Sequence, residues 1–180
     1  DMIKPDFGEQ VEPHMVASDG AQGDALHNVY ALLYNRCVYE AASRYSKAGA
    51  FLFSRAAWAG SQRYPSQWGG DPQAGWGGRA ASVRGGLSWG LTGAPVYATA
   101  AGGFYGGGRD PLLYVRRAQA SVFSAHMRLH GIGAREPWSY GPEAERAAMA
   151  ALELRYRLLP YLWRTVEEAS ATGLPVQRAM

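Results

Sequence analysis

Short apolar segments recur along this 180-residue chain, and each is followed by a long loop and then by a helical stretch. Residues 50–55 and 94–99 are too short for helices and carry consecutive apolar side chains, as strands buried on both faces do. We predict strands there, a further strand at residues 174–180, and the end of an earlier strand at the start of the sequence. Short buried strands that alternate with helices favour an α/β fold with a parallel sheet covered by helices.

Helical patterns fill the intervals between these strands. Asp110 followed by Pro111 is a typical helix start, with a side-chain N-cap and proline in the first turn. We expect Pro160 to break or kink the last helix and Gly173 to end it. The predicted helices cover residues 25–46, 79–90, 110–126 and, from Pro142, the stretch up to Gly173, whereas residues 57–78 are predicted to be a loop rich in Trp and Gly.

The long loops follow the strands rather than the helices, which is typical of a (β/α)8 TIM barrel whose active site is built from those loops. A complete barrel of this kind needs about 250 residues. We therefore expect residues 1–180 to be a single fragment of one barrel, with the N-terminal strands missing. A doubly wound sheet is the alternative fold, but it requires a glycine fingerprint after its first strand that this sequence lacks.

Composition narrows the classes of function. The chain has 18 Lys and Arg against 15 Asp and Glu, a net charge of +3, and the basic residues form no run, so a nucleic-acid partner is not expected. The longest stretch with few charges is rich in Gly and Thr, so a membrane span is not expected either. Cys37 is the one cysteine and cannot form an internal disulfide. We expect it to be a small buried side chain, and a cytoplasmic location is favoured.

Metal and phosphate sites have weak sequence support. His126 and His130 have the i,i+4 spacing of two zinc ligands on a helix, but no third ligand is evident. Residues 102–108 are rich in glycine but lack the Gly-Lys-Ser/Thr ending of a phosphate-binding loop. We expect this segment to be a mobile loop at the barrel rim, and we expect no metal or organic cofactor.

Two aspartates occupy the places where barrel chemistry is expected. Asp6 follows the first strand and Asp71 lies in the loop after the next strand, so both should project from one rim. Retaining glycoside hydrolysis needs two carboxyl groups about 5–5.5 Å apart. Arg55 would keep Asp6 ionised, and an aromatic wall such as Trp68 would suit a protonated Asp71. Since an aspartate in a glycine-rich loop is more often a turn residue, position alone leaves this open.

A set of segments, in order and with consistent spacing, resembles glycoside hydrolase family 31 over essentially the whole chain. These segments are Lys4-Pro-Asp6-Phe-Gly-Glu9, His27-Asn-Val-Tyr-Ala-Leu-Leu-Tyr-Asn-Arg36, Phe53-Ser-Arg55, Gln67-Trp-Gly-Gly-Asp71, Arg84-Gly-Gly-Leu-Ser88, Arg128-Leu-His-Gly131, Arg135-Glu-Pro-Trp138, Tyr156-Arg-Leu-Leu-Pro-Tyr161 and Pro175-Val-Gln-Arg178. The resemblance implies barrel strands four (its end) to eight. It also implies a retaining α-glycosidase that hydrolyses terminal α-linked glucosides or xylosides through a covalent glycosyl-enzyme intermediate.

The resemblance also implies roles for particular residues. Asp6 matches the nucleophile and Asp71 the acid/base, while Glu9 is expected to be structural and to pair with an arginine. The implied partner is an oligosaccharide or glycoside substrate, and the full-length protein is a candidate homo-oligomer. The residues expected to bind substrate are Arg55, Trp68, Thr99 and Phe104.

The sequence departs from the family at the predicted sixth barrel strand. Thr99 and Ala100 stand where the family carries His and Asp. Loss of two groups that hydrogen-bond a sugar weakens stabilisation of the transition state. The sequence therefore leaves three possibilities open: an enzyme for another sugar or of weak activity, a catalytically impaired carbohydrate-binding homologue, or an inactive barrel fragment.

Overall fold

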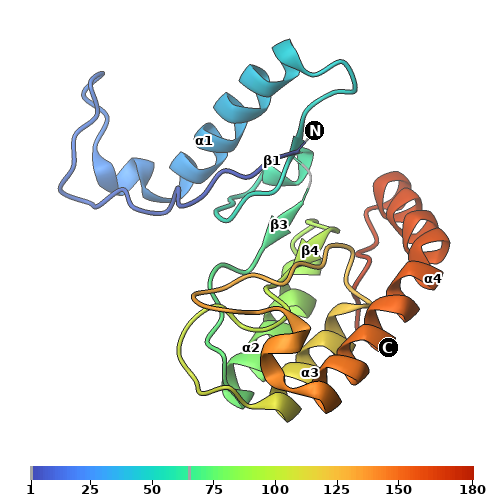
Figure 1. Ribbon diagram of the computed structural model, residues 1–180. Helices are drawn as coiled ribbons and strands as arrows, with labels where there is room; N and C mark the ends of the chain where they lie inside the picture. The colour runs from blue at the N-terminus through green and yellow to red at the C-terminus, as the bar shows by residue number, and fades with distance from the viewer. Residues whose placement is uncertain (1, 65) are drawn as a thin grey trace. The chain divides into compact units, whose positions relative to one another are not determined.

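The computed structural model (Figure 1) describes residues 2–64 and 66–180. Its first two strands pair in parallel. Strand β1 (Met2–Ile3) pairs with β2 (Phe51–Leu52), with Met2 opposite Phe51 and Ile3 opposite Leu52. Just past β2, Ser54 forms a parallel bridge with Gln67 of β3 (Gln67–Trp68). The strands β1, β2 and β3 therefore run in the same direction, and the segments that follow β1 and β2 leave the sheet at the same edge.

Helix α1 (Gly23–Tyr45) lies between β1 and β2 in sequence and agrees with the helix predicted for residues 25–46. Asn35 is 1% exposed, and its side-chain amide donates a hydrogen bond of 2.9 Å to the carbonyl oxygen of Ala56. This bond fastens the inner face of α1 to the loop after β2. A buried side-chain amide is costly unless it is hydrogen-bonded, and this bond is the reason that Asn35 is tolerated in the interior.

The prediction that Cys37 is buried is wrong, because its side chain is exposed. The buried positions of α1 are Gly23, Ala31, Asn35 and Ala42. Cys37 lies two residues beyond Asn35, and a step of two residues in a helix leads to the opposite face.

Helix α2 (Trp76–Gly90) packs against β4 (Tyr97–Ala98), which follows it in sequence. A Cβ atom at Gly86 would lie 2.7 Å from Cε1 of the Tyr97 ring, so this helix position must remain glycine for the strand to approach. The packing against Tyr97 explains why a residue that lowers helix stability lies within α2.

Helix α3 (Pro111–Ser121) starts as predicted, since the Asp110 carboxylate accepts a 3.0 Å hydrogen bond from the Leu113 backbone N–H. It ends at Ser121, so the predicted extension to residue 126 is wrong. The Arg155 guanidinium donates to the carbonyl oxygens of Val122, Ser124 and Ala125 at 2.6–2.9 Å. These carbonyl groups bond to an arginine from another helix instead of continuing the helix.

Helix α4 (Pro142–Thr172) is 31 residues long and follows the 3-10 turn η2 (Pro137–Tyr140). It lies beside α3 (Figure 1), where Ala118 and Ala148 are both 1% exposed. Pro160 does not break α4, because an exposed proline removes one backbone hydrogen bond while the turns on both sides continue. Gly173 ends the helix as predicted, with a left-handed φ of 77°.

Two further predictions differ from the structure. Residues 174–180 are not a strand: the Val176 N–H donates a 3.0 Å hydrogen bond to Pro95, but this segment forms no regular ladder with its neighbours among the described residues. The predicted loop at residues 57–78 contains the 3-10 turn η1 (Ser61–Arg63), strand β3 and the start of α2. Strands of two residues leave too short a pattern for sequence periodicity to reveal.

The chain divides into two compact units, Asp1–Trp68 and Gly69–Met180. The prediction of a single barrel fragment therefore stays a prediction. Within the described ranges 2–64 and 66–180, no helix has the length and apolar character needed to cross a membrane.

The N-cap of α3 provides a test of this local folding. Replacing Asp110 with Ala removes the acceptor for the Leu113 N–H and should lower stability by about 1 kcal/mol. Asp110→Asn keeps a side-chain oxygen and should lose only a few tenths of that amount. Hydrogen exchange at the first turn of α3 measures both effects. Equal exchange in the Ala and Asn variants would contradict the capping role.

Candidate active site

The carboxylate of Asp6 is the centre of a dense polar network in the unit Asp1–Trp68. Its Oδ2 lies 2.6 Å from Nζ of Lys4, and its Oδ1 accepts a 3.0 Å hydrogen bond from the Phe7 backbone N–H. Nη1 of Arg55 lies 3.1 Å from the same Oδ1. The Asp6 side chain keeps 42% of its surface exposed. The carboxylate is thus held at both oxygens and still faces solvent.

The backbone explains how Asp6 is presented. Asp6 lies three residues past β1 and Arg55 three residues past β2, so parallel pairing brings both to one edge. Directly after Asp6 the chain turns sharply, with left-handed φ angles of 58° at Phe7 and 96° at Gly8. A Cβ at Gly8 would lie 2.9 Å from Cδ1 of Tyr34 on α1. Glycine therefore permits both the turn and the close approach to the helix.

Arg55 connects Asp6 to a second carboxylate. Its Nε donates a 2.6 Å hydrogen bond to Oε1 of Glu9, and its guanidinium lies 4.0 Å from the centroid of the Phe7 ring. The Arg55 side chain is only 14% exposed. The expected pairing of Glu9 with an arginine is confirmed, as is the expected placement of Arg55 beside Asp6.

Electrostatics favour the charged form of Asp6. Partial burial raises the pKa of Asp6. The hydrogen bonds from Lys4 and the Phe7 N–H, together with the charges of Lys4 and Arg55, lower that pKa by more than burial raises it. The net result is a pKa below the ordinary value of an aspartate. Asp6 is therefore ionised at neutral pH, as a carboxylate nucleophile must be.

A cleft of about 450 Å³ opens beside Asp6, within the range of volumes found for ligand sites. Tyr30 and Tyr34, one turn apart on α1, form part of its wall with their rings nearly parallel at a centroid distance of 6.3 Å. Flat aromatic side chains of this kind suit the apolar faces of sugars. The sequence indicated no site role for these tyrosines, although their i,i+4 spacing on a predicted helix indicates that both rings share one face. The cleft is lined by Asp6, Phe7, Gly8, Gln10, Val11, Met15, Tyr30 and Tyr34.

Trp68 lies in the interior of the same unit, 1% exposed. Its ring packs against Phe53 with centroids 5.0 Å apart, and Nζ of Lys4 lies 4.4 Å from the ring centroid. The structure therefore brings Trp68 together with Lys4 and, through it, with Asp6. Its predicted contact with substrate stays a prediction.

The remaining predicted site residues belong to the unit Gly69–Met180. Asp71 is exposed on the loop before α2. Thr99 directly follows β4 and is partly buried, whereas Ala100 is fully buried. The partly buried Phe104 ring has its centroid 5.3 Å from that of His130. Because Asp6 and Asp71 lie in different units, their predicted spacing of about 5–5.5 Å stays a prediction.

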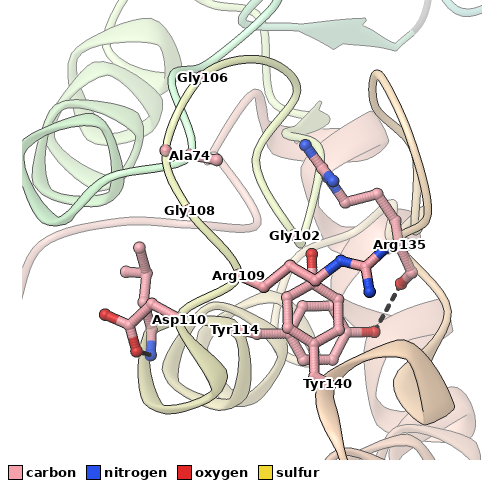
Figure 2. Close-up of a pocket in the computed structure, with 11 residues that line it drawn as sticks. Ala74, Gly102, Gly106, Gly108, Arg109, Asp110, Tyr114, Arg135 and Tyr140 are labelled. Atoms are coloured by element: carbon pink, nitrogen blue, oxygen red, sulfur yellow. Dashed lines mark hydrogen bonds between the residues drawn. The ribbon is translucent and has the colours of Figure 1, made fainter.

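Arg135, which Figure 2 shows beside Tyr114, anchors the start of the glycine-rich loop, a role the sequence did not reveal. Its Nε donates to the Gly103 carbonyl oxygen at 2.8 Å and its Nη2 to that of Phe104 at 3.1 Å. The Tyr114 hydroxyl donates a 2.7 Å hydrogen bond to the Arg135 carbonyl oxygen, and burial raises the pKa of Tyr114, so this donor stays protonated. The adjoining cavity of about 40 Å³ is far smaller than the sites that hold sugars.

Histidines do not form a metal site in the part of the chain that the structure describes. No group of three or more His, Cys, Asp or Glu side chains is arranged to hold a metal among residues 2–64 and 66–180. Burial and the nearby Arg155 charge lower the pKa of His126, so its imidazole is neutral at pH 7.

Parallel strands that alternate with helices, with an ionised aspartate beyond a strand end, are typical of a (β/α)8-barrel enzyme domain. The chain belongs to glycosyl hydrolase family 31: the model of that family's TIM-barrel domain matches residues 1–165. This confirms the family resemblance of the sequence, and it assigns the barrel fold to the domain.

Relatives and solved structures agree with the family. An α-xylosidase of Emericella nidulans is 38% identical over the whole chain, which spans 23% of that relative. A Flavobacterium johnsoniae family 31 dextranase complexed with glucose is 34% identical over 98% of the chain and 24% of its own, with a TM-score of 0.88. A cycloalternan-degrading enzyme from Trueperella pyogenes in complex with a covalent intermediate is 28% identical over 98% of the chain and 26% of its own, with a TM-score of 0.87. The chain thus spans about a quarter of the length of these proteins.

The cations around Asp6 provide a test of the site's electrostatics. Replacing Lys4 with Met removes a hydrogen bond and a charge that lower the Asp6 pKa, so that pKa should rise. A carbon-13 NMR titration of the Asp6 carboxyl group measures the change. Lys47→Met, an exposed lysine in the turn after α1, is the matched control and should leave the Asp6 pKa unchanged. An unchanged or lower pKa in Lys4→Met would contradict the network.

Proposed function

We propose that the protein is a retaining α-glycosidase that hydrolyses terminal α-linked glucosides or xylosides. The observation that carries the proposal is the Asp6 carboxylate, ionised, oriented at both oxygens and bordering a cleft of about 450 Å³. A carboxylate in this state is a competent nucleophile for a sugar carbon.

In the first proposed step, Asp71 donates a proton to the glycosidic oxygen while Asp6 attacks the anomeric carbon. The bond from that carbon to the leaving oxygen breaks, an ester bond to Asp6 forms, and the aglycone leaves as an alcohol. In the second step, Asp71 accepts a proton from water, the water oxygen attacks the anomeric carbon, and the ester bond to Asp6 breaks. This chemistry requires two carboxyl groups and no metal or organic cofactor.

The two aspartates differ in ways that suit these roles. Lys4 and Arg55 hold Asp6 in its charged form, and the Phe7 N–H fixes the direction of one oxygen. Asp71 lies exposed on a loop, so water can reach it for the second proton transfer. The ionised, oriented carboxylate of Asp6 supports the nucleophile role, and the exposure of Asp71 to water supports the acid/base role.

The relatives support the substrate class and the mechanism. The Emericella nidulans relative is an α-xylosidase, and the Flavobacterium johnsoniae structure holds glucose. The Trueperella pyogenes structure contains a covalent intermediate, which agrees with the proposed ester to Asp6. Thr99 and Ala100 lack the His and Asp side chains of the family, so we propose that they set the choice of sugar in this protein.

A trapped intermediate tests the nucleophile. A fluorinated glycosyl fluoride should label the full-length protein at Asp6, and mass spectrometry of its peptides should locate the adduct on that residue. Asp6→Ala should lower kcat on aryl α-glycosides by about 10³-fold or more. An adduct on Glu9, or near-normal turnover by Asp6→Ala, would overturn the assignment.

The acid/base role of Asp71 has a separate signature. Asp71→Ala should slow hydrolysis of glycosides with poor leaving groups by about 10²–10⁴-fold. A dinitrophenyl glycoside needs little protonation and should lose much less in the first step. Asp19→Ala, at an exposed aspartate in another loop, is the matched control. Equal losses for good and poor leaving groups would contradict general-acid catalysis by Asp71.

A further inference from the structure

We propose that Trp68 is a positioning residue for the nucleophile. Its indole ring holds the Lys4 ammonium by a cation–π contact, and Lys4 in turn fixes the position of the Asp6 carboxylate. The inference rests on the proposed function, because it explains how that function's nucleophile is oriented. It assigns Trp68 a role that differs from direct contact with a sugar.

Distances connect the three residues in a chain. Nζ of Lys4 lies 4.4 Å from the centroid of the Trp68 ring and 2.6 Å from Oδ2 of Asp6. A cation within about 6 Å of a tryptophan centroid is attracted by the ring's negative face. Lys4 and Asp6 are two residues apart, a spacing that places side chains on the same side of an extended segment. One ammonium therefore contacts the ring and the carboxylate at once.

The Trp68 ring is a rigid support. It is 1% exposed and packs against Phe53 at a tilt of 32°. The Trp68 backbone N–H donates a 3.0 Å hydrogen bond to Ser54, whose bridge with Gln67 joins β3 to the chain past β2. A lysine ammonium sits on a flexible four-carbon stem that stays mobile when it is partly exposed. The Lys4 side chain is 34% exposed. The ring supplies the restraint that the lysine lacks.

The cation–π contact between Trp68 and Lys4 matters most when Asp6 changes charge. In the glycosyl ester Asp6 is neutral, so Lys4 loses its partner and would be drawn towards water. The Trp68 ring remains a partner for the ammonium throughout, because its attraction does not depend on the state of Asp6. The cation is then in place when the ester breaks and the carboxylate charge returns.

Fluorination of one ring tests this directly. Site-specific incorporation of 5-fluoro- and then tetrafluorotryptophan at position 68 of the full-length protein withdraws electron density while nearly preserving shape. We expect the Asp6 pKa, read by carbon-13 NMR, to rise stepwise with fluorine number, and the acid limb of kcat/KM to move upwards with it. Among the described residues, the charged or titratable groups around Asp6 besides Lys4 are Arg55, which contacts Asp6, Glu9, which contacts Arg55, and Tyr30 and Tyr34, which line the cleft. Fluorination at position 68 alters none of these groups. At pH values below the Asp6 pKa, kcat/KM of the tetrafluorotryptophan protein should be about 3- to 30-fold lower than that of the unmodified protein.

Two controls separate positioning from packing. Tetrafluorotryptophan at Trp163, which is 68% exposed on α4, should change neither readout. In a Lys4→Met background, fluorination at position 68 should have no further effect on the Asp6 pKa, as a double-mutant cycle requires. Trp68→Phe, which keeps a smaller aromatic face, should give an intermediate rise.

The outcomes distinguish this inference from the proposed function. A flat response of the Asp6 pKa to fluorine number, or an equal response in the Lys4→Met background, would overturn the role of the cation–π contact. This holds even if the trapping reagent labels Asp6. If Asp6 is not labelled but its pKa still follows the fluorine number through Lys4, the proposed function fails while the contact between Trp68 and Lys4 stands.

Discussion

The parallel pairing of β1 with β2 is the constraint on which the arrangement around Asp6 depends. The register places Ile3 opposite Leu52, so the residues three positions beyond each strand, Asp6 and Arg55, reach the same edge. An antiparallel pairing would send these two segments to opposite edges of the sheet. The turn at Phe7 and Gly8 then directs the chain back towards α1, and Glu9 reaches the far side of Arg55. The geometry of the site thus follows from backbone pairing before any side chain is considered.

The charges in this network balance, and the proposed reaction disturbs that balance by one unit. Lys4 and Arg55 carry two positive charges, and Asp6 and Glu9 carry two negative ones. Forming the ester on Asp6 removes one negative charge and leaves a net positive site, which favours return of the carboxylate in the second step. Glu9 keeps Arg55 anchored by a 2.6 Å contact throughout, while Trp68 is the anchor we infer for Lys4. Each cation therefore has a partner that does not take part in bond making.

The sequence predicted the helices and the Asp6 environment well because these depend on local signals. The Asp110–Pro111 start, the end of α4 at Gly173 and the pairings of Arg55 with Asp6 and Glu9 are all confirmed. What failed depends on contacts distant in sequence. The end of α3 is set by Arg155, some 30 residues further on, and the anchoring by Arg135 of carbonyl groups near Gly103 has no local pattern. The predicted burial of Cys37 was wrong because the apolar residues around it do not indicate which face of α1 is covered.

The loop that carries Asp71 shows how an exposed residue can still be held in position. On one side of Asp71 the Gly69 N–H donates to the Ala98 carbonyl oxygen at 3.1 Å, and on the other the Ala74 N–H donates to that of Tyr105 at 2.7 Å. The Pro72 carbonyl oxygen accepts a 2.6 Å hydrogen bond from Phe104. A Cβ at Gly103 would lie 2.6 Å from Cα of Ala74, so glycine is required for the two loops to meet. The acid/base role proposed for Asp71 would need both access to water and a fixed backbone, and this loop supplies both.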